Sequence, residues 1–188
     1  MVGPLFQLLE QRTGSTMRAF EAISQVAERL GTPGVVSMEE QLAGLALCAR
    51  GETVERVAKY LSWRDFERFC SSILRARGFR VRENITLKKP RAQIDILAVS
   101  ERACLAIDCK HWARSAGYSG LARLVEAQKA RARRLRDTLD NLGPIATVIL
   151  VLVDQGARFV SGGAVVPIFT VGDFLNNLEG YRENLDLV

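Results

Sequence analysis

The chain has 188 residues, of which 48% are hydrophobic and 25% charged, and its formal net charge is +5 at pH 7. This composition excludes a disordered chain and predicts a globular protein large enough to bury a core. No apolar run approaches the roughly 18–20 residues that cross a bilayer, and the start lacks the pattern of a signal peptide. We therefore expect a cytoplasmic protein without a membrane partner.

The first 60 residues are expected to be helical. Apolar spacing predicts a helix over residues 16–30 and a short helix over residues 52–61. Between them, Ser37 with Glu40 three residues later predicts a capped helix that ends near Ala49. We interpret residues 1–61 as a helical cap or a dimerisation region, which leaves a homodimer open. A helix-turn-helix over GETVERVAKYLSWRDFERF is the alternative, and it would predict sequence-specific DNA binding without metal.

From Trp63 onward, helices and strands are mixed. Ser62, with Asp65 three residues later, predicts a capped helix over residues 63–77 that Gly78 ends. Strands are expected over residues 79–85, 93–99 and 103–109, with a turn at residues 88–90. A helix over residues 118–142, strands over 145–153 and 165–171, and a helix from near Asp173 complete the order α-β-β-β-α-β-β-α. The predicted fold class is α/β, with helices covering a mixed sheet in residues 62–188.

The second and third strands carry two carboxylates in apolar surroundings. If their turn centres on Glu101-Arg102, Asp95 lies directly opposite Asp108, and opposite side chains share a face of the sheet. Lys110 lies two residues beyond Asp108 and points the same way. Two neighbouring carboxylates repel each other unless a cation neutralises them, and Mg²⁺ binds to such groups. The alternative is that both aspartates sit at strand ends and pair with Lys110 or nearby arginines.

The two helices that flank these strands add further candidates. Glu67 falls at the border of the apolar stripe of residues 63–77 and can reach the sheet edge, although a solvated residue is the alternative. Gln128 lies within the inward face of the helix over residues 118–142, where it contacts either the site or the backbone. The other faces of that helix are crowded with basic side chains. These suit either a solvated surface or a DNA phosphate backbone, and include Lys129, Arg131, Arg134 and Arg136.

The cysteines do not suggest a zinc site. Cys48, Cys70, Cys104 and Cys109 form no CxxC pair, and His111 is the single histidine. We interpret all four cysteines as small buried hydrophobic residues.

Taken in order, these residues resemble the PD-(D/E)XK nuclease superfamily. The resemblance rests on Glu67 in a helix, then Gln93-Ile94-Asp95, then Asp108-Cys109-Lys110. It spans residues 63–174 and is nearest to the Mrr-type restriction endonucleases and the archaeal Holliday-junction resolvases, which GFRVREN and VPIFTVGDFL also resemble. The resemblance implies a restriction endonuclease-like α-β-β-β-α-β core and a DNA endonuclease or DNA-processing nuclease, with a role in DNA repair, that hydrolyses phosphodiester bonds with Mg²⁺ or Mn²⁺. A catalytically inactive member that binds DNA or a repair partner is the alternative.

The resemblance also implies a role for each residue. Asp95, Asp108 and the main-chain carbonyl of Cys109 would bind the metal, and Lys110 would orient or activate the attacking water. Glu67 would support this metal or a second one, while Gln93 and Gln128 would contact the site or the substrate. Two departures stand against a full match. Gln93 follows Ala92 where relatives often carry Gly or Asp, and the tyrosine found four residues after the glutamine in RecB-type members is absent.

Overall fold

The computed structural model describes residues 3–31, 39–48, 50–53, 56–57, 60–111, 117–139, 142–152 and 158–188. The predicted helix cap at Ser37 lies outside these residues, and the predicted helix over 52–61 lies partly outside them. None of the helices in the described ranges is both long and apolar enough to cross a membrane.

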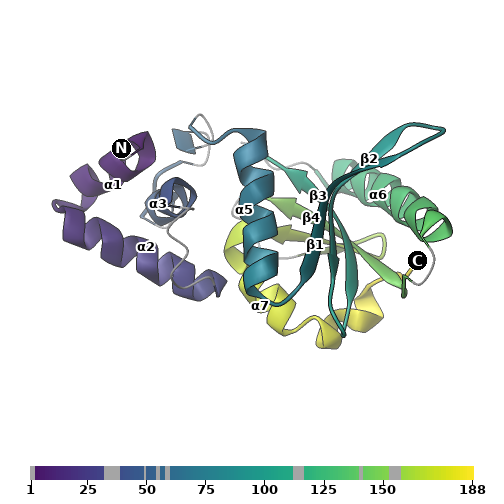
Figure 1. Cartoon of the computed structure of the whole chain (residues 1–188). Coiled ribbons are helices and arrows are strands. Elements are labelled where there is room, and N and C mark those ends of the chain that lie inside the picture. Colours follow the sequence, from purple (N-terminus) through teal and green to yellow (C-terminus); the bar gives the residue numbers. More distant parts are fainter. Residues whose placement is uncertain are drawn as a thin grey trace.

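Among the described residues of the N-terminal part lie the helices α1 (Pro4–Thr13), α2 (Thr16–Leu30) and α3 (Glu39–Cys48) (Figure 1). The bounds of α2 are those predicted. Its start is fixed by the side chain of Ser15, which accepts a hydrogen bond from the N–H of Arg18, and Gly31 ends it in a left-handed conformation. The helix α1 was not predicted with bounds of its own. Its buried side chains, Leu5, Phe6 and Leu9, pack toward α2 and α3.

The helix α5 (Trp63–Ala76) begins with the predicted capping box. Ser62 Oγ accepts a hydrogen bond from the N–H of Asp65, and the Asp65 carboxylate accepts one from the N–H of Ser62. The apolar stripe of α5 is buried against the sheet, where the helix contacts β1, β2 and β3. Burial of this face places Glu67, at its border, beside the sheet.

The sheet has six strands in the order β1-β2-β3-β4-β6-β5. β1 (Arg80–Leu87), β2 (Ala92–Val99) and β3 (Cys104–Lys110) form an antiparallel meander. β4 (Ile145–Val151) and β6 (Gly163–Pro167) continue in parallel, and β5 (Arg158–Val160) pairs antiparallel with β6 at the edge. Figure 1 shows α5 on one side of this sheet and α6 (Tyr118–Thr138) on the other. The mixed sheet with covering helices confirms the predicted fold class.

Several predicted elements end earlier than expected, among them the strand predicted over residues 145–153, which ends at Val151. The strand predicted over residues 165–171 stops at Pro167, and Ile168–Thr170 form a 3₁₀ turn that leads into α7 (Val171–Asn176). The apolar run continues because the 3₁₀ turn is itself buried, so hydrophobicity alone marked it as strand. The helix predicted over residues 118–142 ends at Thr138, because Leu139 adopts an extended conformation. The three-residue strand β5 was not predicted.

The sheet divides the core into a larger and a smaller side. The larger side lies under α5 and joins the N-terminal helices to β2, β3 and β4 in one apolar cluster. Arg77, directly after α5, donates hydrogen bonds to the carbonyl of Leu30 at 3.0 Å and to Asn176 Oδ1 at 2.5 Å. It thereby ties α2 and α7 to the end of α5. Two smaller clusters lie under α6.

Candidate active site

Asp95 and Asp108 lie where β2 and β3 stop pairing. The last pair of that ladder toward the site is Ile96 with Ile107, so the next residue on each strand is the aspartate. This is the predicted register, and it is confirmed. The turn between the strands fixes it, because the N–H of Ser100 donates a hydrogen bond of 2.8 Å to the carbonyl of Ala103 and so sets the pairing of the residues on either side. The ladder therefore ends directly before the two aspartates.

Asp108 is buried, with 3% of its surface exposed. Its Oδ1 accepts a hydrogen bond from Arg131 Nη1 at 3.0 Å, and its Oδ2 lies 2.8 Å from Lys110 Nζ. The Lys110 contact is an ion pair without hydrogen-bond geometry, so Oδ2 has no hydrogen-bond donor among the described residues. Two cations thus offset the cost of burying this carboxylate, and one of its oxygens keeps open acceptor capacity.

Asp95 is held by the neighbouring strand. Its Oδ2 accepts a hydrogen bond of 2.8 Å from the main-chain N–H of Cys109. Burial raises the pKa of Asp95 above its usual value, the bond from Cys109 opposes this rise, and the negative charge of Asp108 adds to it. The two aspartates therefore repel each other in the protein without metal.

Glu67, on α5, interacts electrostatically with Asp95, Asp108 and Lys110. Burial raises the pKa of Glu67 to about 7, with further contributions from the negative charges of Asp95 and Asp108, while Lys110 lowers it. This carboxylate lies close enough to respond to all three predicted core residues. Strongly shifted carboxyl groups that influence one another are typical of functional sites.

A cleft of about 440 Å³ opens beside this cluster. The first two turns of α5 form one wall and the β1–β2 hairpin forms the other. The lining residues are Trp63, Arg64, Glu67, Arg68, Glu83, Asn84, Gln93 and Asp95. Convergence is therefore partial, because Glu67, Gln93 and Asp95 line the cleft while Asp108 and Lys110 lie behind it. Arg68 of α5 also lines the cleft.

Arg131 holds the predicted core together rather than projecting from α6. Its Nη1 donates to Asp108 Oδ1 and also to the main-chain carbonyl of Gln93, at 3.2 Å. It therefore bridges β3 and β2 where their ladder has ended. The sequence carried a signal for this position, because Arg131 lies three residues after Gln128 and thus on the same side of the helix.

The other α6 residues have different environments from those predicted. Lys129 is buried, and its ammonium contacts Asp186, the carbonyl of Ser161 and Glu126 at 2.6, 2.9 and 3.1 Å. This corrects its assignment as a DNA contact, because the ammonium does not face solvent.

Gln128 is fully buried, and neither polar atom of its side-chain amide has a hydrogen-bond partner among the described residues. It does not line the cleft. Its predicted contact with substrate is therefore not supported by its position.

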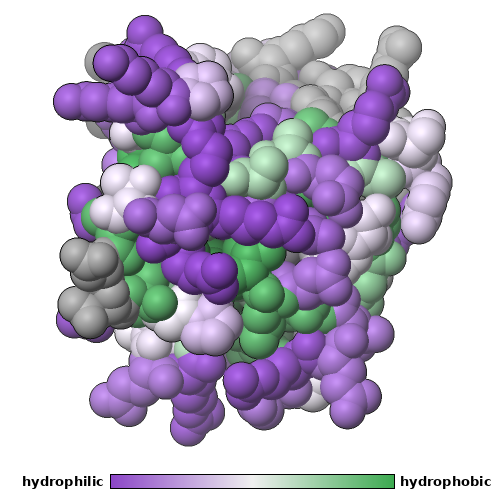
Figure 2. Space-filling model, turned by 90° about the vertical axis from the view of Figure 1, so that its right-hand side faces the viewer, coloured by the Kyte–Doolittle hydropathy of each residue, from purple (hydrophilic) through white to green (hydrophobic). Residues whose placement is uncertain are grey.

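The remaining predicted DNA contacts divide into two kinds. Arg134 Nη2 donates to the carbonyls of Lys88 and Pro90, at 3.3 and 2.6 Å, and so supports the β1–β2 turn. Arg136 is exposed on the same helix. Figure 2, which views the molecule from the side where α6 lies, shows a mostly hydrophilic surface with apolar side chains in the hollows. Arg136 is thus the predicted DNA contact that this surface leaves most accessible.

The donor set fits a hard divalent cation in part. Mg²⁺ takes oxygen ligands, commonly one or two carboxylates, with water completing its shell. Asp95 and Asp108 offer two neighbouring, repelling carboxylates, and Asp108 Oδ2 is a buried oxygen that no described residue supplies with a hydrogen-bond donor. Within the described ranges no group of three or more His, Cys, Asp or Glu side chains is arranged to hold a metal. The arrangement therefore favours the two aspartates over a three-carboxylate site with Glu67.

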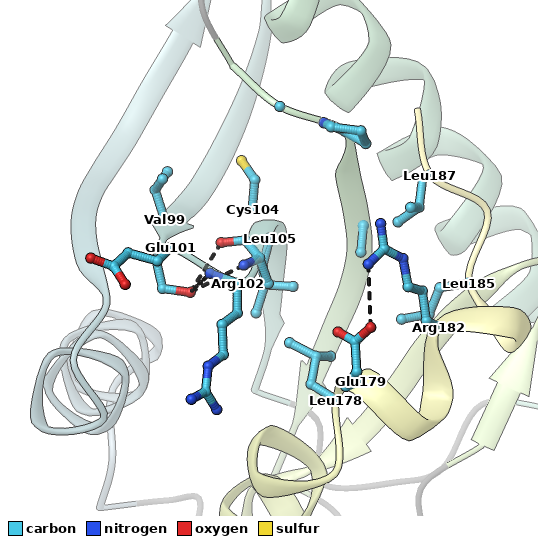
Figure 3. Close-up of a pocket in the computed structure, with 15 residues that line it drawn as sticks. Val99, Glu101, Arg102, Cys104, Leu105, Leu178, Glu179, Arg182, Leu185 and Leu187 are labelled. Atoms are coloured by element: carbon cyan, nitrogen blue, oxygen red, sulfur yellow. Dashed lines mark hydrogen bonds and ion pairs between the residues drawn. The ribbon is translucent and has the colours of Figure 1, made fainter.

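A second cavity, of about 190 Å³, lies at the other end of the β2–β3 pair (Figure 3). The turn between these strands and the C-terminal segment line it, with Arg102 and Arg182 among the lining residues. Arg182 is paired with Glu179 at 3.3 Å. None of the predicted site residues lines this cavity, so the chemistry expected from the sequence belongs to the first cleft.

Comparison with known proteins gives two matches. Residues 58–135 match a family model described as restriction endonuclease. An uncharacterized protein from Archaeoglobus fulgidus is 30% identical over 123 residues, which cover 64% of this chain and 95% of that protein. No solved structure matches significantly. The residues matched by the family model include Glu67, Asp95, Asp108 and Lys110.

Proposed function

The chain belongs to the restriction endonuclease-like superfamily, and we propose that it is a metal-dependent nuclease that hydrolyses phosphodiester bonds in DNA. One observation carries this proposal. Asp95 and Asp108 are the next residues beyond the last pair of β2 and β3, Asp108 Oδ2 lies 2.8 Å from Lys110 Nζ, and Glu67 lines a cleft together with Asp95. Two neighbouring carboxylates beside a lysine can hold a divalent cation next to a phosphate group and add a further positive charge there.

The protein's own residues would share the work as follows. Asp95 and Asp108, with the carbonyl of Cys109 as the resemblance implies, would hold Mg²⁺ or Mn²⁺. Such an ion supplies positive charge to the phosphate and lowers the pKa of an attacking water. Lys110, held against Asp108, would stabilise the negative charge that develops on the phosphate and orient the water. Arg131 would keep Asp108 in place from α6.

We further propose that residues 62–188 carry the nuclease and that residues 1–61 form a helical cap or a dimerisation region. The position of the cleft supports this assignment of the two regions. Its lining begins at Trp63, and no described residue before that position contributes to it. The N-terminal helices pack on the far end of α5 instead, through the contact between Arg77 and Leu30.

The test is a cleavage screen on single-stranded, duplex and branched DNA with Mg²⁺, with Mn²⁺ and with EDTA. We expect cleavage with either metal, none with EDTA, and none with Asp108→Asn. Titration calorimetry of Mn²⁺ without DNA gives a readout independent of activity, and Asp95→Asn should weaken this binding. Metal-independent cleavage, or full activity of Asp108→Asn, would contradict the proposal.

A second candidate is a catalytically inactive member of the family that binds DNA or a repair partner. The neutralisation of Asp108 by two cations favours it, because Lys110 and Arg131 compete with a metal for this carboxylate. This candidate predicts salt-dependent DNA binding that is the same with Mg²⁺ and with EDTA, and no cleavage of any DNA. The screen described above separates the two functions.

A further inference from the structure

Trp63 is the first residue of α5, and its side chain is 53% exposed on the wall of the cleft. Single exposed hydrophobic residues are common on protein surfaces, but this indole borders a polar cleft that also contains Glu67 and Asp95. The guanidinium carbon of Arg64 lies 5.1 Å from the centre of the indole ring, in the geometry of a cation–π contact. A flat aromatic surface and a positive charge therefore lie together beside the candidate site.

The rest of the cleft suits a nucleotide. Arg68 follows Arg64 by one turn of α5 and lines the same wall. On the opposite wall Gln93 Nε2 donates a hydrogen bond of 2.9 Å to Asn84 Oδ1. Paired amides of this kind can exchange donors and acceptors with the edge of a base. The cleft volume of about 440 Å³ falls within the roughly 300–1,000 Å³ of small-ligand pockets.

We propose that this cleft holds one unpaired nucleotide, with its base stacked on Trp63 and its phosphates near Arg64 and Arg68. The DNA that the protein acts on would then carry a single-stranded or splayed segment next to the bond that is cut. Proteins that bind single strands combine aromatic stacking platforms with basic side chains that follow the backbone, which is the combination found here. The inference rests on the proposed function for its link to cleavage, but nucleotide binding can be measured without it.

The experiment measures binding in EDTA, so that cleavage does not interfere. Fluorescence anisotropy compares a short single-stranded oligonucleotide with a blunt duplex of the same sequence. Wild type should bind the single strand more tightly. Trp63→Ala should weaken single-strand binding by about tenfold or more, whereas Trp63→Phe should stay within about threefold of wild type because it keeps a stacking ring. Phe20→Ala is the matched control, because Phe20 is 48% exposed on α2, outside the cleft.

The outcomes separate the two proposals. Unchanged single-strand binding by Trp63→Ala, or an equal loss on the duplex, would overturn the stacking role. If circular dichroism shows that Trp63→Ala is misfolded, Trp63→Phe provides the test instead. A loss of single-strand binding by more than about threefold in Trp63→Phe would then count against stacking. A parallel assay with Mg²⁺ tests cleavage alone. Binding that depends on Trp63 without any cleavage would contradict the proposed nuclease and leave this inference standing.

Discussion

Arg131, on α6, donates a hydrogen bond of 3.0 Å to Asp108, on β3, and through the same nitrogen one of 3.2 Å to the carbonyl of Gln93 on β2. This contact spans the point where the β2–β3 ladder ends after Ile96 and Ile107. Through it, α6 holds the side chain of Asp108 on β3 in place. The bond also neutralises a carboxylate that the protein buries.

Replacing Arg131 with alanine should lower the free energy of unfolding by about 1–3 kcal/mol, because Asp108 loses a charged donor and retains Lys110 alone. Arg131→Lys should recover part of this loss, since it restores the charge without the planar guanidinium. Urea denaturation measures both. Arg136→Ala, an exposed arginine on the same helix, should change stability by less than about 0.5 kcal/mol. Equal stability of the Arg131→Ala and Arg136→Ala variants would show that the bridge is not structural.

Asp108→Asn and Lys110→Ala should each reduce metal-dependent cleavage at least about 100-fold, because several kcal/mol of charge stabilisation at the phosphate is lost. Single-turnover kinetics with Mg²⁺ checks this, and circular dichroism checks the fold. Asp137→Asn changes an exposed acid on α6 and should cleave like wild type. Near wild-type rates for either site variant would remove that residue from the assigned core.

The stability of the metal-free protein should depend on the protonation of Glu67. Its pKa in the folded state is about 7, above the 4.5 expected for an unfolded chain. Between these values the folded state holds the proton more tightly, so this group's contribution to stability falls as pH rises from about 4.5 to 7.

Glu67→Gln should therefore raise the melting temperature at pH 8 in EDTA, by about 2–4 °C, and change it little at pH 4.5. Glu21→Gln, on the exposed side of α2, provides the matched control. A gain that is the same at both pH values would show that Glu67 is not held protonated by its surroundings.

DNA affinity should fall steeply with salt, because basic side chains displace counterions from the phosphates. Arg136→Ala should weaken binding without changing sequence preference and should reduce the slope of log K against log salt by about 1. Lys129→Gln should leave this slope unchanged, because the Lys129 ammonium is bound to Asp186 and the Ser161 carbonyl. Nitrocellulose filter binding over a salt series gives both slopes. A flat plot for wild type would remove nucleic acid as the partner.

The sequence alone determined the features that depend on neighbouring residues in the chain. The bounds of α2 and the capping box of Ser62 and Asp65 follow from local periodicity and local hydrogen bonding. The register that continues to Asp95 and Asp108 follows from the short turn at residues 100–103, where the N–H of Ser100 donates a hydrogen bond to the carbonyl of Ala103. The order of elements, and with it the family, could therefore be predicted without coordinates.

Only the tertiary structure determined which residues the side chains of α6 contact. Arg131 and Lys129 lie two residues apart in one basic stretch, and both were predicted to contact DNA. One instead bridges Asp108 to β2, and the other is buried against Asp186, which is 57 residues away along the chain. Helical spacing gives the side of the helix on which a residue lies. Which carboxylate the residue contacts there depends on long-range packing. The cleft wall formed by Trp63, Arg64 and Arg68 emerged in the same way, from the docking of α5 against the β1–β2 hairpin.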